Sequence, residues 1–174
     1  MAKTAFYLVV LTLVLLLAQV VVFNHMCLFN VAVPMVFIFA LIKMPVSINV
    51  NWLMTIGFFM GLFVDVFADT YGMNSLSMTL LSVLRRPVMS LYLPRGEELP
   101  DDTMPSIKVF GVGTFVKYIT TLTLLFCTIV FVIEAFSLLN FWLLIARIIF
   151  STVLSVVIML AIESLFKGQS EKRL

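Results

Sequence analysis

The sequence has few charged residues and very few histidines and cysteines. Only 11% of its 174 residues are charged, against roughly 25% in soluble domains. It has one histidine, His25, and two cysteines, Cys27 and Cys127, which lie a hundred residues apart with no CxxC pair and no His or carboxylate at a metal-site spacing. A metal centre, a CxxC redox pair and a Ser-His relay are therefore not expected, and we predict no metal and no cofactor.

Motifs of the common enzyme classes are also missing. The chain contains no G-x-S-x-G, no HExxH, no GxGxxG and no P-loop. Asp65 and Asp69 are four residues apart and in principle share a proton, but Asp69 is expected at a helix end in water. We therefore expect that the protein is not an enzyme, and we predict no nucleic-acid partner.

Apolar residues are abundant instead. They make up 63% of the chain, and the mean hydropathy is +1.18, which predicts an all-α integral membrane protein. Because a span needs ~20 residues, residues 1–174 are expected to form a single polytopic membrane domain. The apolar runs predict six transmembrane helices, at about residues 5–23, 31–42, 51–67, 75–92, 107–133 and 141–166. Pro34 falls in the first turn of the short second helix, where its missing N–H is tolerated.

The distribution of positive charge predicts the orientation. With six spans and a cytoplasmic N-terminus, the C-terminus is cytoplasmic too, and the outer loops carry no Lys or Arg. The cytoplasmic side then holds nine of the eleven Lys and Arg residues, namely Lys3, Lys43, Arg85, Arg86, Arg95, Lys108, Lys167, Lys172 and Arg173. The proline-rich acidic loop 93–105 is expected on the same side, as a soluble contact surface or a solvated linker. Whether the helix before it bends or ends at Pro87 stays open.

The stretch from Gly57 to Leu76 places two carboxylates in an apolar segment. Burying a charge in lipid costs at least ~2.5 kcal/mol, so these carboxylates need a structural reason. On a helix, two opposite faces form: Gly57, Gly61 and Asp65 on one, and Phe59, Phe63 and Phe67 on the other. The glycines predict close packing of another helix, either within the chain, such as helix 141–166, or from a partner.

The turn after this helix is also predictable. Gly72 can adopt a positive φ, and Asn74 is a plausible N-cap for the next helix.

Three charges inside the predicted spans lie at similar depths. At ~1.5 Å per residue, Asp65 and Arg147 are each about 10 Å from the outer face, and Lys117 lies some 4–5 Å deeper. We therefore predict that Asp65 pairs with Arg147 or Lys117, since ionisable groups within a membrane usually pair. The alternative is that Arg147 extends alone to the outer surface.

The motifs now resemble a known family. Pro34 in a short second helix, a Lys-Met-Pro turn, Gly57-(x)3-Gly61-Leu62-(x)2-Asp65 and Gly72-(x)3-Leu76 are similar to the bacterial rod shape-determining protein MreD family. The resemblance covers about Pro34–Leu84, and elsewhere the chain is compatible with it. The loop 93–105 departs from the family pattern. The residues of this sequence that match the family pattern, and to which the resemblance assigns a structural or partner-binding role, are Pro34, Gly57, Gly61, Asp65 and Gly72.

This resemblance implies a fold similar to the substrate-binding components of ECF vitamin transporters. It also implies a scaffold of the cell-elongation complex in the bacterial inner membrane, supporting peptidoglycan synthesis and cell shape. Its direct partner would be the single-pass protein MreC, which links it to MreB, RodA and a transpeptidase. The alternative function is a substrate-binding subunit of a vitamin-type transporter, which would need a polar pocket near the outer face.

Overall fold

The computed structural model describes residues 2–22, 33–92, 103–134 and 141–171, and these residues form helices without β-strands. In chain order the helices are α1 (Ala2–Val21), α2 (Ile38–Ile42), α3 (Val50–Ala68), α4 (Met73–Tyr92), α5 (Ile107–Phe110), α6 (Val112–Glu134) and α7 (Phe141–Glu171). The all-α prediction is thus confirmed for the described part of the chain.

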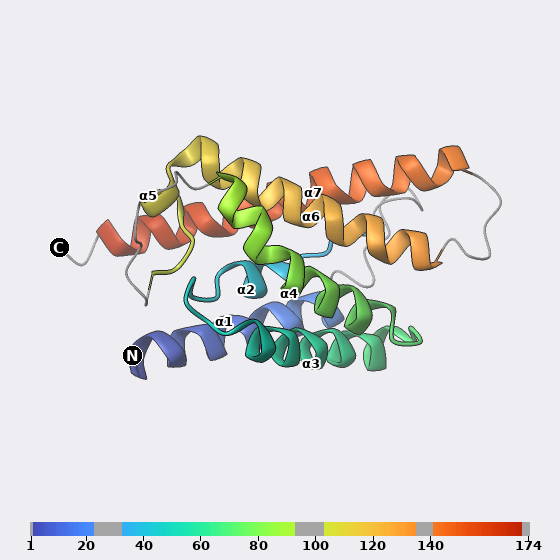
Figure 1. Cartoon of the computed structure of the whole chain (residues 1–174), viewed down its shortest axis with the longest axis horizontal. Helices are drawn as coiled ribbons and strands as arrows, with labels where there is room; N and C mark the ends of the chain where they lie inside the picture. Colours follow the sequence, from blue (N-terminus) through green and yellow to red (C-terminus); the bar gives the residue numbers. More distant parts are fainter. Residues whose placement is uncertain (1, 23–32, 93–102, 135–140, 172–174) are drawn as a thin grey trace.

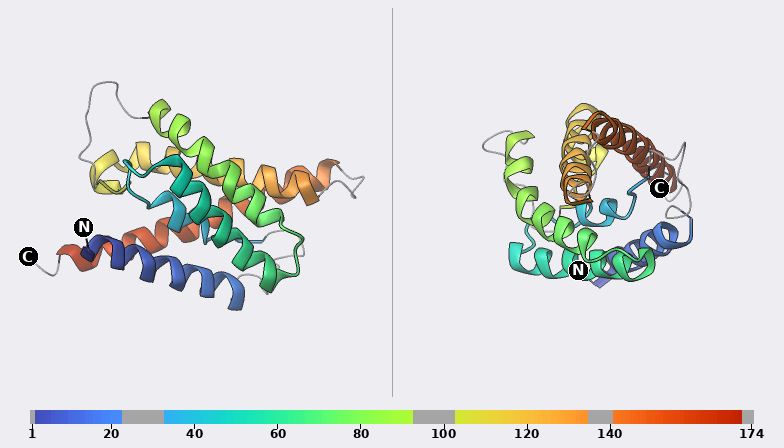
Figure 2. Two further views of the ribbon diagram at one scale, coloured as in Figure 1. Left: turned by 60° about the horizontal axis from the view of Figure 1, so that its bottom comes forward. Right: turned by 90° about the vertical axis from the view of Figure 1, so that its right-hand side faces the viewer.

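The helices form a bundle around a short buried element. Helices α1 and α3 lie side by side, α4 crosses between them and α6, and α6 packs along α7 (Figure 1). Viewed along its length, the bundle encloses α2 (Figure 2). α1 begins and α7 ends at one end of the molecule, whereas α3 and α6 end, and α4 and α7 begin, at the other (Figure 1).

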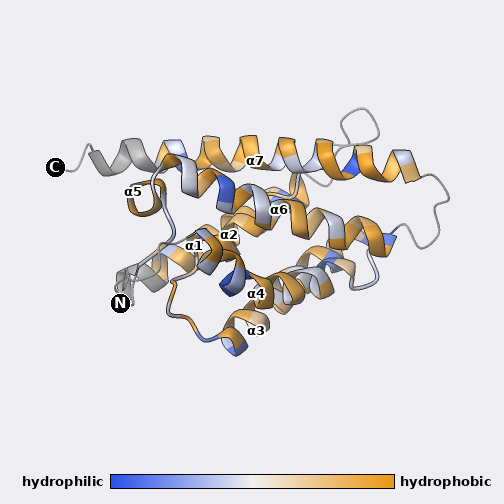
Figure 3. Cartoon of the chain, turned by 45° about the horizontal axis from the view of Figure 1, so that its top comes forward, coloured by the Kyte–Doolittle hydropathy of each residue, from blue (hydrophilic) through white to orange (hydrophobic). Residues whose placement is uncertain are grey.

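Three of the described helices are long and apolar enough to cross a membrane. They are α3, α6 and residues 141–165 of α7, whereas the apolar part of α1, Phe6–Val21, is shorter. Apolar residues make up most of α6 and of the coloured part of α7 (Figure 3). These lengths and compositions are those of a membrane protein.

The predicted second helix, residues 31–42, is wrong in most of its length. Residues 31 and 32 lie outside the described residues, residues 33–37 are not helical, and only 38–42 form α2. A helix of five residues cannot cross a bilayer. Every residue from 36 to 42 has no exposed surface, so this segment is the centre of the core. The apolar run therefore reflects burial by other helices rather than a lipid-facing span.

The backbone corrects one further prediction and decides one question that the sequence left open. The predicted helix 107–133 is interrupted at Gly111, whose φ of 76° and ψ of 157° separate α5 from α6. Only glycine adopts this conformation readily. The sequence left open whether the helix bends or ends at Pro87. It does not end there, since α4 continues to Tyr92, although the proline removes one backbone hydrogen bond.

Candidate functional site

The two glycines of α3 mark where α4 packs. A Cβ at Gly61 would lie 2.4 Å from the Cα of Ser75, and one at Gly57 would lie 2.6 Å from the Oγ of Ser82. Both distances are too short for a side chain, so the glycines permit the contact between the two helices. The predicted close packing is confirmed, but its partner is α4 and neither α7 nor another chain. Phe59, Phe63 and Phe67, on the opposite face, are exposed.

Asp65 holds the start of α4. Its Oδ1 accepts hydrogen bonds from the Asn74 backbone N at 3.0 Å, the Asn74 side-chain Nδ2 at 3.0 Å and the Thr70 Oγ1 at 2.5 Å, and its Oδ2 accepts one from the Ser75 N at 2.9 Å. The first N–H groups of a helix have no partner within the helix, and a carboxylate there is also favoured by the helix dipole. Asp65 is 3% exposed and acts as an N-terminal cap supplied by the preceding helix.

The turn between α3 and α4 requires two residues with positive φ. Gly72 has a φ of 78°, which confirms the prediction for that residue, and Asp69 has a φ of 51°. Asn74 is not the N-cap that we predicted, since α4 already begins at Met73. Its backbone and side chain both donate to Asp65 instead.

The predicted pairing of Asp65 with Arg147 or Lys117 is wrong. The Arg147 Nη1 lies 3.3 Å from the Glu134 Oε1, an ion pair between the end of α6 and the start of α7. Lys117 is exposed on α6. Asp65 is already satisfied by four hydrogen bonds from the α3–α4 turn, so its charge needs no cation. Arg147 therefore does not extend alone to the surface either.

Pro34 belongs to a non-helical segment held by side chains of other helices. Its carbonyl oxygen accepts a hydrogen bond from the Gln19 Nε2 at 3.0 Å, and the Gln19 Oε1 accepts one from the Val36 N at 2.9 Å. From α7, the Oγ of Ser151 accepts from the Val33 N at 3.1 Å, and the Oγ of Ser155 accepts from the Met35 N at 2.8 Å. Irregular backbone at membrane depth is tolerated where protein surrounds and satisfies it.

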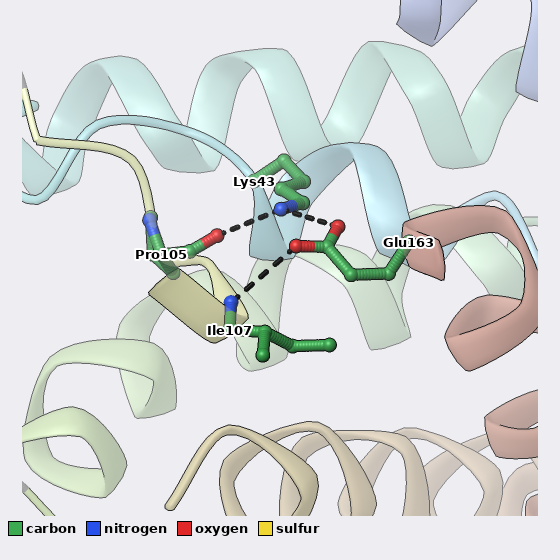
Figure 4. Close-up of polar contacts among 4 residues, drawn as sticks. All are labelled: Lys43, Pro105, Ile107 and Glu163. Atoms are coloured by element: carbon green, nitrogen blue, oxygen red, sulfur yellow. Dashed lines mark hydrogen bonds and ion pairs between the residues drawn. The ribbon is translucent and has the colours of Figure 1, made fainter. Parts of the chain in front are cut away.

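A buried ion pair closes the other end of this segment (Figure 4). The Lys43 Nζ lies 2.5 Å from the Glu163 Oε2 and donates to the Pro105 carbonyl at 3.0 Å, and the other Glu163 oxygen accepts from the Ile107 N at 3.4 Å. Both charged side chains are less than a tenth exposed. The pair joins the end of α2, the approach to α5 and the last turns of α7.

Arg85 fixes the turn that follows α2. Its guanidinium donates to the Pro45 carbonyl at 3.3 Å, to the Ile42 carbonyl at 3.4 Å and to the Met44 carbonyl. It is only 1% exposed, although its position in the sequence suggested a cytoplasmic surface residue. The next residue, Arg86, donates to the Ile48 carbonyl at 3.0 Å.

A cavity of about 360 Å³ opens where α3 and α6 end and α4 begins. Its walls are mainly apolar, with four polar residues, and it is lined by Val33, Met35, Val64, Phe67, Ala68, Asp69, Thr70, Met73, Asn74, Val130, Phe131 and Glu134. Among the residues that the structure describes, no three His, Cys, Asp or Glu side chains gather as a metal site would require. A mainly apolar lining with a few polar groups is typical of pockets that bind small organic molecules.

Sequence reasoning missed the polar residues that hold the centre together. Gln19 is the one amide in the first apolar run, and Ser151 and Ser155 are spaced for one face of a helix. Lys43 and Glu163 both lie near the predicted cytoplasmic ends of their segments. These residues can be recognised in the sequence, but the sequence does not indicate which groups they hydrogen-bond or pair with. His25, Cys27 and residues 93–102 of the acidic loop lie outside the described residues.

Comparisons of the chain with protein-family models, with curated proteins and with solved structures find no match.

Proposed function

We propose that the protein is a membrane scaffold of the bacterial cell-elongation complex, of the MreD type, located in the inner membrane. The observation that carries the proposal is the resemblance over Pro34–Leu84. The fold supports it with a physical reason for the matching residues. Gly57 and Gly61 admit α4, and Asp65 caps α4, so these residues make the α3–α4 hairpin rigid. A rigid bundle is what a scaffold offers its partners.

The proposed topology has six crossings with both termini in the cytoplasm. The second crossing is partly extended: five residues at ~3.3 Å and five at ~1.5 Å reach about 24 Å, more than a helix of the same length. It runs from Val33, which lines the cavity, to Lys43, which contacts Pro105 and Glu163. Labelling of single cysteines at residues 24, 74 and 140 from outside, and at 96 and 170 from inside, tests this arrangement. Reaction at Gly96→Cys from outside would contradict it.

The partner in this proposal is MreC, through which the chain connects to MreB, RodA and a transpeptidase. The face of α3 with Gly57 and Gly61 is covered by α4 and is not free for another helix. Two apolar grooves of about 350 and 470 Å³ lie between α1 and α3, and both include Leu13 and Ile56. We place the single transmembrane helix of MreC along these grooves, next to the exposed side chains of Trp52 and Phe59.

Co-purification from membranes through a tag on MreC tests both the partner and the surface. Thr55 lines one groove, so Thr55→Trp should fill it and reduce the captured chain. Thr128→Trp on α6 is a matched control, because both hydroxyls are exposed and donate to the carbonyl four residues earlier. Absence of capture of the unmodified chain would reject the partner. Equal capture of the two variants would reject the grooves.

The second candidate function is a substrate-binding subunit of a small-molecule transporter. One observation favours it, namely the partly polar cavity at the predicted outer end of the bundle. This role predicts tight binding of a vitamin-like ligand and no requirement for MreC. Binding tests against vitamins, alongside capture by MreC, separate the two functions.

A further inference from the structure

The cavity between α3, α4, α6 and the non-helical segment is large enough for a small organic molecule. Its volume of about 360 Å³ falls in the range of ligand pockets, which begins at roughly 300 Å³. Two phenylalanines, Phe67 and Phe131, and two methionines, Met35 and Met73, contribute to its walls. Such walls suit an apolar or aromatic body, since methionine and aromatic side chains make favourable contacts with rings.

One residue of the cavity wall has a polar atom without a hydrogen-bond partner. Asn74 is 5% exposed, and its Nδ2 donates to the Asp65 Oδ1 at 3.0 Å and to the Thr70 Oγ1 at 3.3 Å. These bonds fix the amide orientation, and its Oδ1 is buried without a hydrogen-bond donor. A buried acceptor without a partner costs free energy. A ligand with an N–H or O–H group would supply the missing donor.

The charge of the cavity selects among such ligands. Asp69 and Glu134 both line it, and no Lys or Arg is among the described residues of its walls. Arg147 forms an ion pair with Glu134 but does not itself line the cavity. Asp65, behind Asn74, adds a further buried negative charge. An anion is disfavoured in these surroundings and a cation is favoured.

We propose that this cavity binds a small amine with an apolar or aromatic body. Its ammonium group donates to the Asn74 Oδ1 and lies near the Asp69 carboxylate, while its body contacts Phe67 and Phe131. This site does not depend on the scaffold role, because it uses only side chains of this chain. Binding is therefore measured on the purified chain alone, and its failure would leave the association with MreC untouched.

The test compares three probes of nearly the same shape: 2-phenylethylamine, 2-phenylethanol and 3-phenylpropionate. Each is added at millimolar concentration and neutral pH to the full chain in detergent, and the midpoint of thermal unfolding is recorded. The amine should raise the midpoint in a saturable way, since a ligand bound only by the folded state stabilises it. The alcohol and the carboxylate should give little shift. Equal shifts from all three probes, or none from the amine, would overturn the proposal.

Two variants and a control locate the binding. Ala68→Phe fills the cavity and should abolish the amine-dependent shift, whereas Val66→Phe, at an exposed residue of the same helix outside the lining, should preserve it. Asp69→Asn should weaken the apparent affinity about fivefold, the size expected for a partly exposed charge pair. Asn also tolerates the positive φ at this position. If Ala68→Phe does not fold, Asp69→Asn decides, and unchanged affinity in that variant overturns the proposal.

Discussion

Replacing Asp65 should destabilise the protein through the loss of a helix cap and not through a broken ion pair. In Asp65→Ala, the backbone N–H groups of Asn74 and Ser75 lose their acceptor at a buried helix start. The side chains of Thr70 and Asn74 lose theirs as well. In Asp65→Asn, one oxygen remains, but the new NH₂ group faces donors, so the conflict is only partly relieved.

The magnitude follows from these contacts. Each buried donor without a partner costs about 1–3 kcal/mol, and loss of an N-cap costs about 0.5–2 kcal/mol. Because two buried backbone N–H groups lose their acceptor, we expect Asp65→Ala to lower the free energy of unfolding by about 3–5 kcal/mol. Asp65→Asn should lose roughly half of that. Asp69→Asn, at an exposed position four residues later, is the control and should stay within about 0.5 kcal/mol.

The assay is thermal unfolding of the purified chain in detergent, followed by size-exclusion chromatography of the heated samples. Exchanging both charges, Asp65→Arg with Arg147→Asp, distinguishes the two explanations. A cap cannot be restored by a charge on α7, so the double exchange should be as unstable as the worse single variant. Recovery of stability in the double exchange, or full stability of Asp65→Ala, would refute the capping explanation.

Three further changes test the packing and the buried polar contacts. Gly61→Ala should prevent folding because its Cβ would lie 2.4 Å from the backbone of α4, whereas Gly113→Ala, with nothing within 4 Å, should be neutral or stabilising in the same unfolding assay. Lys43→Met and Glu163→Gln should each cost about 3–5 kcal/mol by leaving one buried charge without its partner, and the double variant should cost less than their sum, as a double-mutant cycle would measure. Gln19→Leu should cost about 1–3 kcal/mol by removing the two hydrogen bonds of Gln19 to the non-helical segment, and proteolysis of that variant should become faster. Equal effects of the two glycine changes would contradict the close packing of α4 on α3. An additive double-mutant cycle would contradict the Lys43–Glu163 pair, and full stability of Gln19→Leu would contradict the role of the Gln19 hydrogen bonds.

The sequence by itself determined the class of protein and several local features. Composition and apolar length predict an all-α membrane protein, and the described part of the chain has three helices long and apolar enough to cross a bilayer. The helix at 51–67, the separation of the Gly57 face from the Phe63 face and the positive φ of Gly72 are confirmed. These features depend on helical periodicity and on the conformational freedom of glycine, which are properties of the local sequence.

Only the tertiary structure decided which groups meet. Counting residues gives the depth of Asp65 and Arg147 in the membrane, but two residues at one depth can lie on opposite sides of a bundle. Asp65 is satisfied by the next turn of its own chain, and Arg147 by Glu134. The segment 33–37 likewise reads as apolar and helical, yet Gln19 and two serines of α7 satisfy its backbone in a non-helical form. Its conformation depends on hydrogen-bonding groups that are distant in sequence, so no local pattern could predict it.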